Sequence, residues 1–163
     1  MSYYIIIRGP LGCGKTTIAK ELAKKLNAEH ISVDDVLEEN NLLDEKEEGY
    51  ISQKSFKKAN EIICKKARPK IKSKTIVIFD GNFYWKSQIT DIIERLDFPQ
   101  HVFTLKAPLN VCIERDLKRD KSHGELAAKV VDKKTTEFDY GIIIDVTQNI
   151  ENCINEIVSY LPK

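Results

Sequence analysis

The sequence predicts one α/β domain in three layers, with a five-stranded parallel sheet between two layers of helices. Five short runs rich in β-branched and aromatic residues alternate with helical patterns along the chain. The run 75–79 is almost wholly apolar, as expected of a strand that is buried on both faces of a parallel sheet. The chain has 163 residues, of which 42% are hydrophobic, and this suits one core better than two. We therefore expect a single domain over 1–163.

The five predicted strands are short and end at polar or turn residues. They comprise residues 3–8, 30–33, 75–79, 102–105 and 142–145. The first strand stops at Gly9-Pro10, which is a loop signal. Strands that alternate with helices are joined by right-handed crossovers, so the helices cover both faces of the sheet.

Helical patterns fill the intervals between these strands. Residues 15–26 place Ile18, Leu22 and Leu26 on one buried stripe. Pro69 should limit the second helix, whereas Pro108 lies near the first turn of the fourth, where proline is tolerated. The acid-rich segment 38–49 has little apolar periodicity, so we expect a solvated, mobile connection there. Further helices are expected at 52–67, 87–96, 109–118, 125–138 and 150–161.

Composition argues against several classes of protein. Lys and Arg number 26 against 25 Asp and Glu, so the net charge of +1 gives no general attraction for anionic membranes, and nucleic acid is not the favoured partner. No apolar run approaches the roughly 20 residues that span a bilayer, and no signal peptide is evident, so we expect a cytoplasmic protein. The four cysteines are irregularly spaced and predict neither disulfides nor a zinc site.

The segment Gly9-Pro-Leu-Gly-Cys-Gly-Lys-Thr16 matches G-x-x-x-x-G-K-[ST] at every fixed position, between a predicted strand and a predicted helix. Its glycines let backbone N–H groups converge on phosphate oxygens, to which the helix presents its positive dipole end. Lys15 can reach the β- and γ-phosphates, and the Thr16 hydroxyl can bind Mg²⁺. The alternative is an ordinary strand-turn-helix. We predict ATP and Mg²⁺ as ligands, with nucleotide contacts from Gly9, Gly12, Cys13, Gly14, Lys15, Thr16, Thr17 and Arg115.

Three aspartates follow predicted strands, at the sheet edge where open α/β folds bind their ligands. Asp34 and Asp35 end the second strand, and either could accept a proton from an attacking hydroxyl or cap the following helix. Asp80 ends the third strand, where it could steady Mg²⁺ or form an Asp-Gly turn. We select Asp34 as the base, Asp80 as a metal ligand and Asp35 as part of an acceptor pocket.

Two further groups of side chains are candidates for the site. Arg115 and Arg119 stand at i and i+4 on one helical face beside a polar loop, so a lid over about 115–126 could bring their guanidinium groups to a transferring phosphoryl group. A surface salt-bridge network is the alternative. Asn82, Tyr84 and Trp85 could line the acceptor pocket, or the aromatic rings could cover core.

These segments together resemble small P-loop kinases of the nucleoside-monophosphate-kinase fold, over essentially the whole chain. Asp34-Asp35 resembles the acid pair of polynucleotide kinases, whose first acid is the general base. The segment 80–87 is similar to one in seryl-tRNA kinases, and 108–116 resembles the lid helix of adenylylsulfate kinases. The resemblance implies a strand order 2-3-1-4-5, counted along the chain, and adenine contacts near 146–149.

The leading hypothesis is a kinase that moves the γ-phosphoryl of Mg-ATP to a hydroxyl or phosphate of a small-molecule or nucleotide acceptor. An RNA or tRNA end is an alternative acceptor. A nucleotide-hydrolysing switch or assembly NTPase is an alternative function, although the sequence has no Asn-Lys-x-Asp guanine signature. A binding module without catalysis is disfavoured by the intact Lys15, Thr16 and paired arginines.

Overall fold

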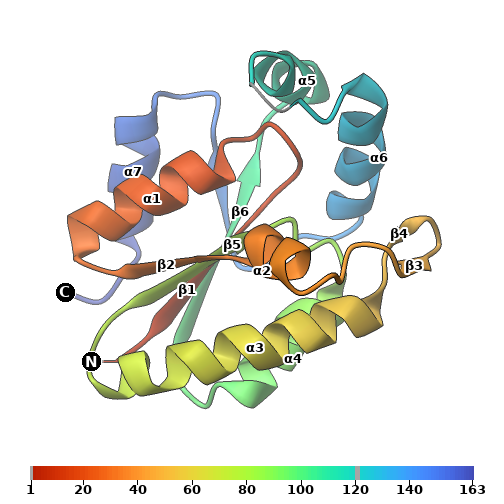
Figure 1. Cartoon of the computed structure of the whole chain (residues 1–163). Coiled ribbons are helices and arrows are strands. Elements are labelled where there is room, and N and C mark those ends of the chain that lie inside the picture. Colours follow the sequence, from red (N-terminus) through yellow and green to blue (C-terminus); the bar gives the residue numbers. More distant parts are fainter. Residues whose placement is uncertain (1, 120–121) are drawn as a thin grey trace.

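The structure is a computed structural model that describes residues 2–119 and 122–163. Five parallel strands form one sheet in the order β2-β5-β1-β6-β7 (Figure 1). Because β5, β6 and β7 are the third, fourth and fifth predicted strands, the expected order 2-3-1-4-5 is confirmed. The strands are β1 (Tyr4–Arg8), β2 (Glu29–Ser32), β5 (Val77–Gly81), β6 (Gln100–Lys106) and β7 (Ile142–Asp145).

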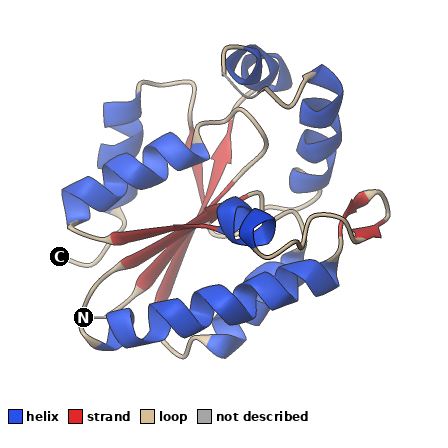
Figure 2. Cartoon of the chain, in the orientation of Figure 1, coloured by secondary structure: helices blue, strands red, loops and turns tan. Residues whose placement is uncertain are grey.

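Helices cover both faces of this sheet, so the three-layer prediction is also confirmed (Figure 2). The alternation of side chains along β1 explains how two cores form. Ile5 and Ile7 pack with α1 and α7, whereas Tyr4 and Ile6 pack with α2, α3 and α4. The helices are α1 (Lys15–Leu26), α2 (Val33–Glu39), α3 (Gln53–Lys72), α4 (Lys86–Arg95), α5 (Leu109–Leu117), α6 (Glu125–Thr135) and α7 (Ile150–Ser159).

The acid-rich segment 38–49 is more ordered than the sequence suggested. Its beginning belongs to α2, and its end forms an antiparallel hairpin of β3 (Lys46–Glu47) and β4 (Tyr50–Ile51). The turn uses Glu48 and Gly49 at φ values of 54° and 85°, a left-handed conformation that glycine adopts without strain. Hydrogen bonds from a distant part of the chain hold this hairpin, and local periodicity carries no signal of them.

Helix α3 also differs from expectation, because Pro69 lies inside it rather than ending it. The missing N–H of a proline costs one hydrogen bond. The following Ile71 is fully buried, and the packing of its side chain in the core offsets that loss. Helices α5, α6 and α7 end one to three residues earlier than predicted.

The described residues bear on two expectations from composition, which concern membrane-spanning segments and the cysteines. None of the helices there has the length and apolar character that crossing a bilayer requires. All four cysteines are buried as free thiols.

Candidate active site

A cavity of about 480 Å³ lies at the carboxyl edge of the sheet, where the loop after β1, α5 and the segment after β7 contribute to its lining. It brings together most of the predicted nucleotide contacts with Asp34, Arg115 and Arg119. Gly9, Asp35, Asp80, Asn82, Tyr84 and Trp85 are not part of its lining. The lining residues are Leu11, Gly12, Cys13, Gly14, Lys15, Thr16, Thr17, Ile18, Asp34, Arg115, Arg119, His123, Val146, Gln148, Ile150 and Cys153.

The glycine-rich loop between β1 and α1 requires glycine at two positions in particular. Gly12 has φ +78°, and a Cβ there would lie 2.1 Å from the backbone oxygen of Cys112. Gly14 has φ +89° and immediately precedes α1. A side chain at Gly12 would collide with α5, and one at Gly14 would strain the backbone. Glycine at both positions therefore lets the loop lie against α5 with its N–H groups at the start of α1.

Lys15 and Thr16, the last residues of the motif, begin α1. The Lys15 side chain is mostly buried, and its Nζ donates a hydrogen bond to the carbonyl oxygen of Pro10 at 2.8 Å. The Thr16 hydroxyl donates to Oδ1 of Asp80 at 3.1 Å. Asp80 is only 1% exposed, and its other oxygen, Oδ2, contacts Nε2 of His30 on the neighbouring strand β2. A role for His30 could not be predicted from the sequence, because a lone histidine in a strand follows no recognisable pattern.

Asp34 and Asp35 lie in the first turn of α2 rather than at the end of β2. Ser32 takes the capping role, since its side chain accepts a hydrogen bond from the N–H of Asp35 at 3.2 Å. Part of the Asp34 side chain is accessible to solvent, and the residue lines the cavity. The surrounding protein atoms nevertheless desolvate its carboxyl group, which raises the pKa of that group. Lys15 lowers the same pKa, and the charge of Asp80 raises it.

The two arginines of the predicted lid reach the cavity in different ways. Nη2 of Arg115 donates to the carbonyl oxygen of Val146 at 2.7 Å, which ties α5 to the end of β7. The Arg119 side chain is 51% exposed, and its Nη1 lies 3.8 Å from Oδ1 of Asp116. Residues 120–121 of the predicted lid fall outside the described residues.

Asp116 organises the turn at residues 122–124, just before α6. It is fully buried, and its Oδ2 accepts hydrogen bonds from the Ser122 hydroxyl and from the backbone N–H groups of His123 and Gly124. Burial alone would raise the pKa of Asp116, but these donors and the His123 side chain hold it below its usual value. The turn places His123 on the cavity wall. His123 lies within the predicted lid, and this position in the sequence could have identified it as a candidate site residue.

Tyr84 and Trp85 are core residues that fasten the hairpin. The N–H of Ile51 donates to the Tyr84 hydroxyl at 3.0 Å, and Nε1 of Trp85 donates to the Ile51 carbonyl at 2.7 Å. The structure therefore places both rings beneath β4, away from the cavity, as in the alternative that they cover core. Asn82 is partly buried, and its Oδ1 has no hydrogen-bond partner among the described residues.

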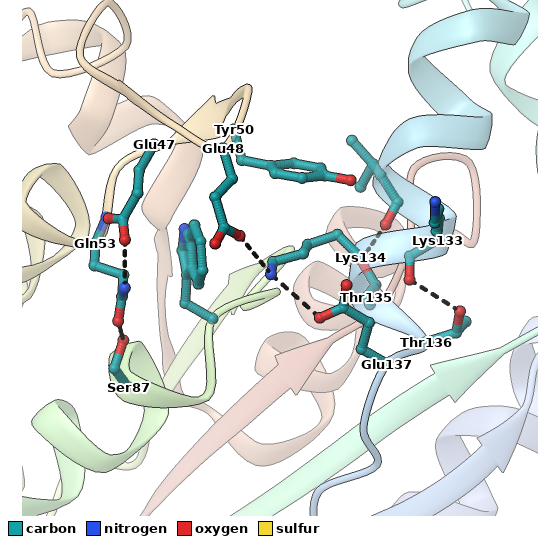
Figure 3. Close-up of polar contacts among 12 residues, drawn as sticks. Glu47, Glu48, Tyr50, Gln53, Ser87, Lys133, Lys134, Thr135, Thr136 and Glu137 are labelled. Carbon is teal, nitrogen blue, oxygen red and sulfur yellow. Dashed lines mark hydrogen bonds and ion pairs between the residues drawn. The ribbon is translucent and has the colours of Figure 1, made fainter.

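The hairpin also contacts α6 (Figure 3). Nζ of Lys134 lies 4.0 Å from the centre of the Trp85 ring and pairs with Glu48 at 3.6 Å and Glu137 at 3.2 Å. The Tyr50 hydroxyl donates to the carbonyl oxygen of Val130 at 3.2 Å. These contacts join the hairpin to the second half of α6.

The strand order and the glycine-rich loop between β1 and α1 define a P-loop fold. Residues 5–139 match the family model described as AAA domain, and the chain belongs to that family. A search of curated proteins finds no match.

Solved structures with a similar fold include several kinases. A sugar kinase from Janibacter sp. HTCC2649 aligns with a TM-score of 0.81 and 17% identity, over 98% of this chain and 94% of that one. A gluconokinase from Sinorhizobium meliloti 1021 aligns with a TM-score of 0.76 and 16% identity, over 97% and 90%. A tunicamycin resistance protein from Deinococcus radiodurans aligns with a TM-score of 0.71 and 19% identity, over 98% and 95%. At these identities the likeness concerns the fold.

Proposed function

We propose that this protein is an ATP-dependent phosphotransferase that moves the γ-phosphoryl group of Mg-ATP to an acceptor hydroxyl. The observation that carries the proposal is the shared lining of one cavity by Lys15, Asp34, Arg115 and Arg119. Cations for a triphosphate and a carboxylate for an acceptor face the same space, and phosphoryl transfer depends on such positioning.

The loop and the start of α1 supply the groups that would hold the triphosphate. Backbone N–H groups and the helix dipole favour anions there. Lys15 would exchange its contact with the Pro10 carbonyl for the β- and γ-phosphates. Val146 and Gln148 line the cavity at the end of β7, where the resemblance to P-loop kinases puts the adenine. Arg115 stands between these two regions, held to the Val146 carbonyl.

Thr16 and Asp80 suit a magnesium ion that is bound mainly through the nucleotide. Mg²⁺ prefers oxygen ligands and usually takes one or two from the protein, with phosphates and waters completing its shell. The Thr16 hydroxyl and Oδ1 of Asp80 are two such oxygens at 3.1 Å. Within the described residues no group of three or more His, Cys, Asp or Glu side chains could hold a metal by itself. When bound, the ion would neutralise charge on the β- and γ-phosphate oxygens.

The acceptor group is proposed to be a hydroxyl rather than a phosphate. A hydroxyl must lose its proton as it attacks. Asp34, which lines the cavity, would accept that proton while the bond to the γ-phosphorus forms and the bond to the β-phosphate oxygen breaks, which releases ADP. A phosphate acceptor needs no base but needs cations of its own. Arg115 and Arg119 are the cavity's arginines, whereas the other three are engaged elsewhere: Arg8, Arg68 and Arg95.

A transfer screen with [γ-³²P]ATP tests this function. Nucleosides, sugars, polyols, hydroxy acids and RNA ends would be offered in parallel with nucleoside monophosphates, and labelled products separated from free phosphate. We expect label on a hydroxyl compound and its loss in Asp34→Asn. Label on a monophosphate would overturn the hydroxyl assignment. Release of free phosphate alone, undiminished in Asp34→Asn, would favour an NTPase.

A further inference from the structure

Helix α3 and the two residues after it concentrate the positive charge of this chain. Residues 53–74 hold nine of its 26 Lys and Arg residues and one of its 25 Asp and Glu residues. The remaining residues therefore carry 17 cations and 24 acids, and they are net negative. The net charge of +1 is the sum of a strongly basic helix and an acidic remainder.

Four of these nine cations lie along one face of the helix. Lys54, Lys58, Lys65 and Lys72 are separated by four, seven and seven residues, so they line up on the same side of an α-helix. All four are exposed. The opposite side of α3 packs into the core. We call these four residues the lysine ridge; at 1.5 Å per residue it extends for about 27 Å. Figure 1 shows α3 running along the outside of the molecule.

The ridge lysines are available for a partner. None of them forms an ion pair with a carboxylate in the ranges 2–119 and 122–163, whereas Lys70 nearby pairs with Glu29 at 2.9 Å. Acids close to the ridge include Glu61, on the same exposed side, and Glu45, whose charge interacts with those of Lys54 and Lys58. Both are outnumbered by the surrounding lysines.

The chemistry of this face favours one kind of partner. The apolar side chains of α3 are directed to the core, and among the described residues the exposed large hydrophobic side chains all belong to other segments. A membrane-bound helix inserts apolar side chains into the lipid, and a protein interface has an apolar centre. Binding to a nucleic acid backbone requires no apolar contact of either kind, because the phosphate charges supply most of the non-specific binding energy. We propose that the lysine ridge binds the phosphate backbone of nucleic acid.

The dimensions of the ridge agree with this partner. About 27 Å approaches one turn of a duplex, roughly 34 Å, so ammonium groups along α3 can follow the phosphates beside one groove. The contact reads no bases, and the proposal predicts binding without sequence preference. It stands independently of phosphoryl transfer, because the ridge contributes nothing to the lining of the cavity.

Fluorescence anisotropy with labelled 20-mers tests the proposal: single-stranded RNA, duplex RNA and duplex DNA, between 50 and 300 mM KCl. Each neutralised phosphate lowers the slope of log K against log salt by about 0.9 on duplex DNA. The variant Lys58→Glu/Lys65→Glu/Lys72→Glu should bind at least about tenfold more weakly and lose roughly two to three units of slope. The matched control is Lys20→Glu/Lys25→Glu/Lys133→Glu, which reverses three exposed lysines on α1 and α6 that also form no ion pair within residues 2–119 and 122–163, and it should bind as the wild type does.

Folding and competing partners are checked with the same proteins. Circular dichroism and ATP binding by calorimetry should be unchanged in both triple variants, because neither touches the core or the cavity. The proposal is overturned if the wild type binds none of the nucleic acids at 50 mM KCl, or if the control weakens as much as the ridge variant. It is also overturned if vesicles of 70% phosphatidylcholine and 30% phosphatidylserine, or polyglutamate, bind the ridge more tightly than nucleic acid does.

Discussion

The Thr16 hydroxyl donates a hydrogen bond to Oδ1 of Asp80 at 3.1 Å, and this contact joins two segments 64 residues apart in the chain. Thr16 is in the first turn of α1, and Asp80 is near the end of β5. The parallel pairing of β1 with β5 brings the two ends together, with Arg8 opposite Gly81. The sheet register therefore sets the distance between the two proposed magnesium ligands.

Replacement of Thr16 tests this pair. Thr16→Val keeps the shape of the side chain and removes the oxygen, so Mg²⁺ should increase ATP affinity about tenfold less than in the wild type. Thr16→Ser keeps the oxygen and should behave as the wild type does. Calorimetry with ATP in Mg²⁺ and in EDTA measures both. Equal magnesium dependence in Thr16→Val and wild type would remove Thr16 from the metal site.

Lys15→Ala should abolish turnover and leave the fold intact. The lysine contacts a backbone carbonyl of its own loop, so its removal leaves no buried charge unpaired. In the proposed reaction it would neutralise phosphate charge, and the loss of such a cation costs about 3 kcal/mol or more, at least a hundredfold in kcat. Thermal unfolding and labelled transfer should be measured on the same sample. A folded Lys15→Ala protein with normal turnover would contradict the proposed role.

The activity should depend on pH through Asp34. Burial raises the pKa of this carboxyl, with Asp80 and Asp35 adding to the rise and Lys15 and His123 opposing it. A general base works in its ionised form, so kcat should fall as the pH drops through the raised pKa, at a pH above the ordinary aspartate value of about 4.

Asp34→Asn should remove this acid limb and lower kcat by about a hundredfold or more, with ATP affinity nearly unchanged. Asp35→Asn is the control, because Asp35 does not line the cavity. Loss of the limb in Asp35→Asn and its retention in Asp34→Asn would assign the base to the other aspartate.

Parts of the structure that depend on local pattern could be predicted from the sequence. The strand before Gly9, the helix after Gly14 and their motif follow from residues adjacent in the chain. The hairpin could not be predicted, because it depends on two hydrogen bonds with residues more than 30 positions further along the chain. The Ile51 N–H donates to the Tyr84 hydroxyl, and the Ile51 carbonyl accepts from Nε1 of Trp85.

The residues of the candidate site that belong to a sequence motif could be predicted. Those that reach the site only through tertiary contacts could not. His123 reaches the cavity through a turn organised by Asp116, and His30 meets Asp80 across two strands. The net charge of the chain also gave no sign of the basic helix, because the positive charge of α3 is cancelled by acidic residues elsewhere in the sequence.

Arg8 should be a large contributor to stability. It is fully buried at the end of β1, and it donates to the carbonyl oxygens of Phe83, Thr135 and Phe138 and to the Thr104 hydroxyl. Burial lowers its pKa to about 10, so it remains charged at neutral pH.

Arg8→Met would leave those acceptors unpaired and should lower the free energy of unfolding by at least about 2 kcal/mol. Arg68→Met removes a single hydrogen bond, to the Arg95 carbonyl, and should cost less than about 1.5 kcal/mol. Urea denaturation measures both variants. Similar losses in the two would mean that the network around Arg8 adds little.

Arg115 and Arg119 should contribute to the transition state to different extents. Arg115 is fastened to the Val146 carbonyl, whereas Arg119 is half exposed and only loosely paired with Asp116. Lysine keeps the charge and loses the planar fork that fits a transferring phosphoryl group. We expect Arg115→Lys and Arg119→Lys each to lower kcat by at least about tenfold. Arg115→Lys should also weaken ATP binding, because it loosens the contact between α5 and β7.

Arg119→Lys should leave ATP binding unchanged, because Arg119 would reach the γ-phosphoryl group only when the segment around it closes. Steady-state turnover with saturating acceptor and calorimetry with ATP separate the two effects. Lys118→Gln is the control: this neighbour pairs with Glu114 on the exposed side of α5, so its loss should change neither measurement. If both arginine variants turn over at the rate of Lys118→Gln, the arginines belong to a surface ion-pair network and carry no role in phosphoryl transfer.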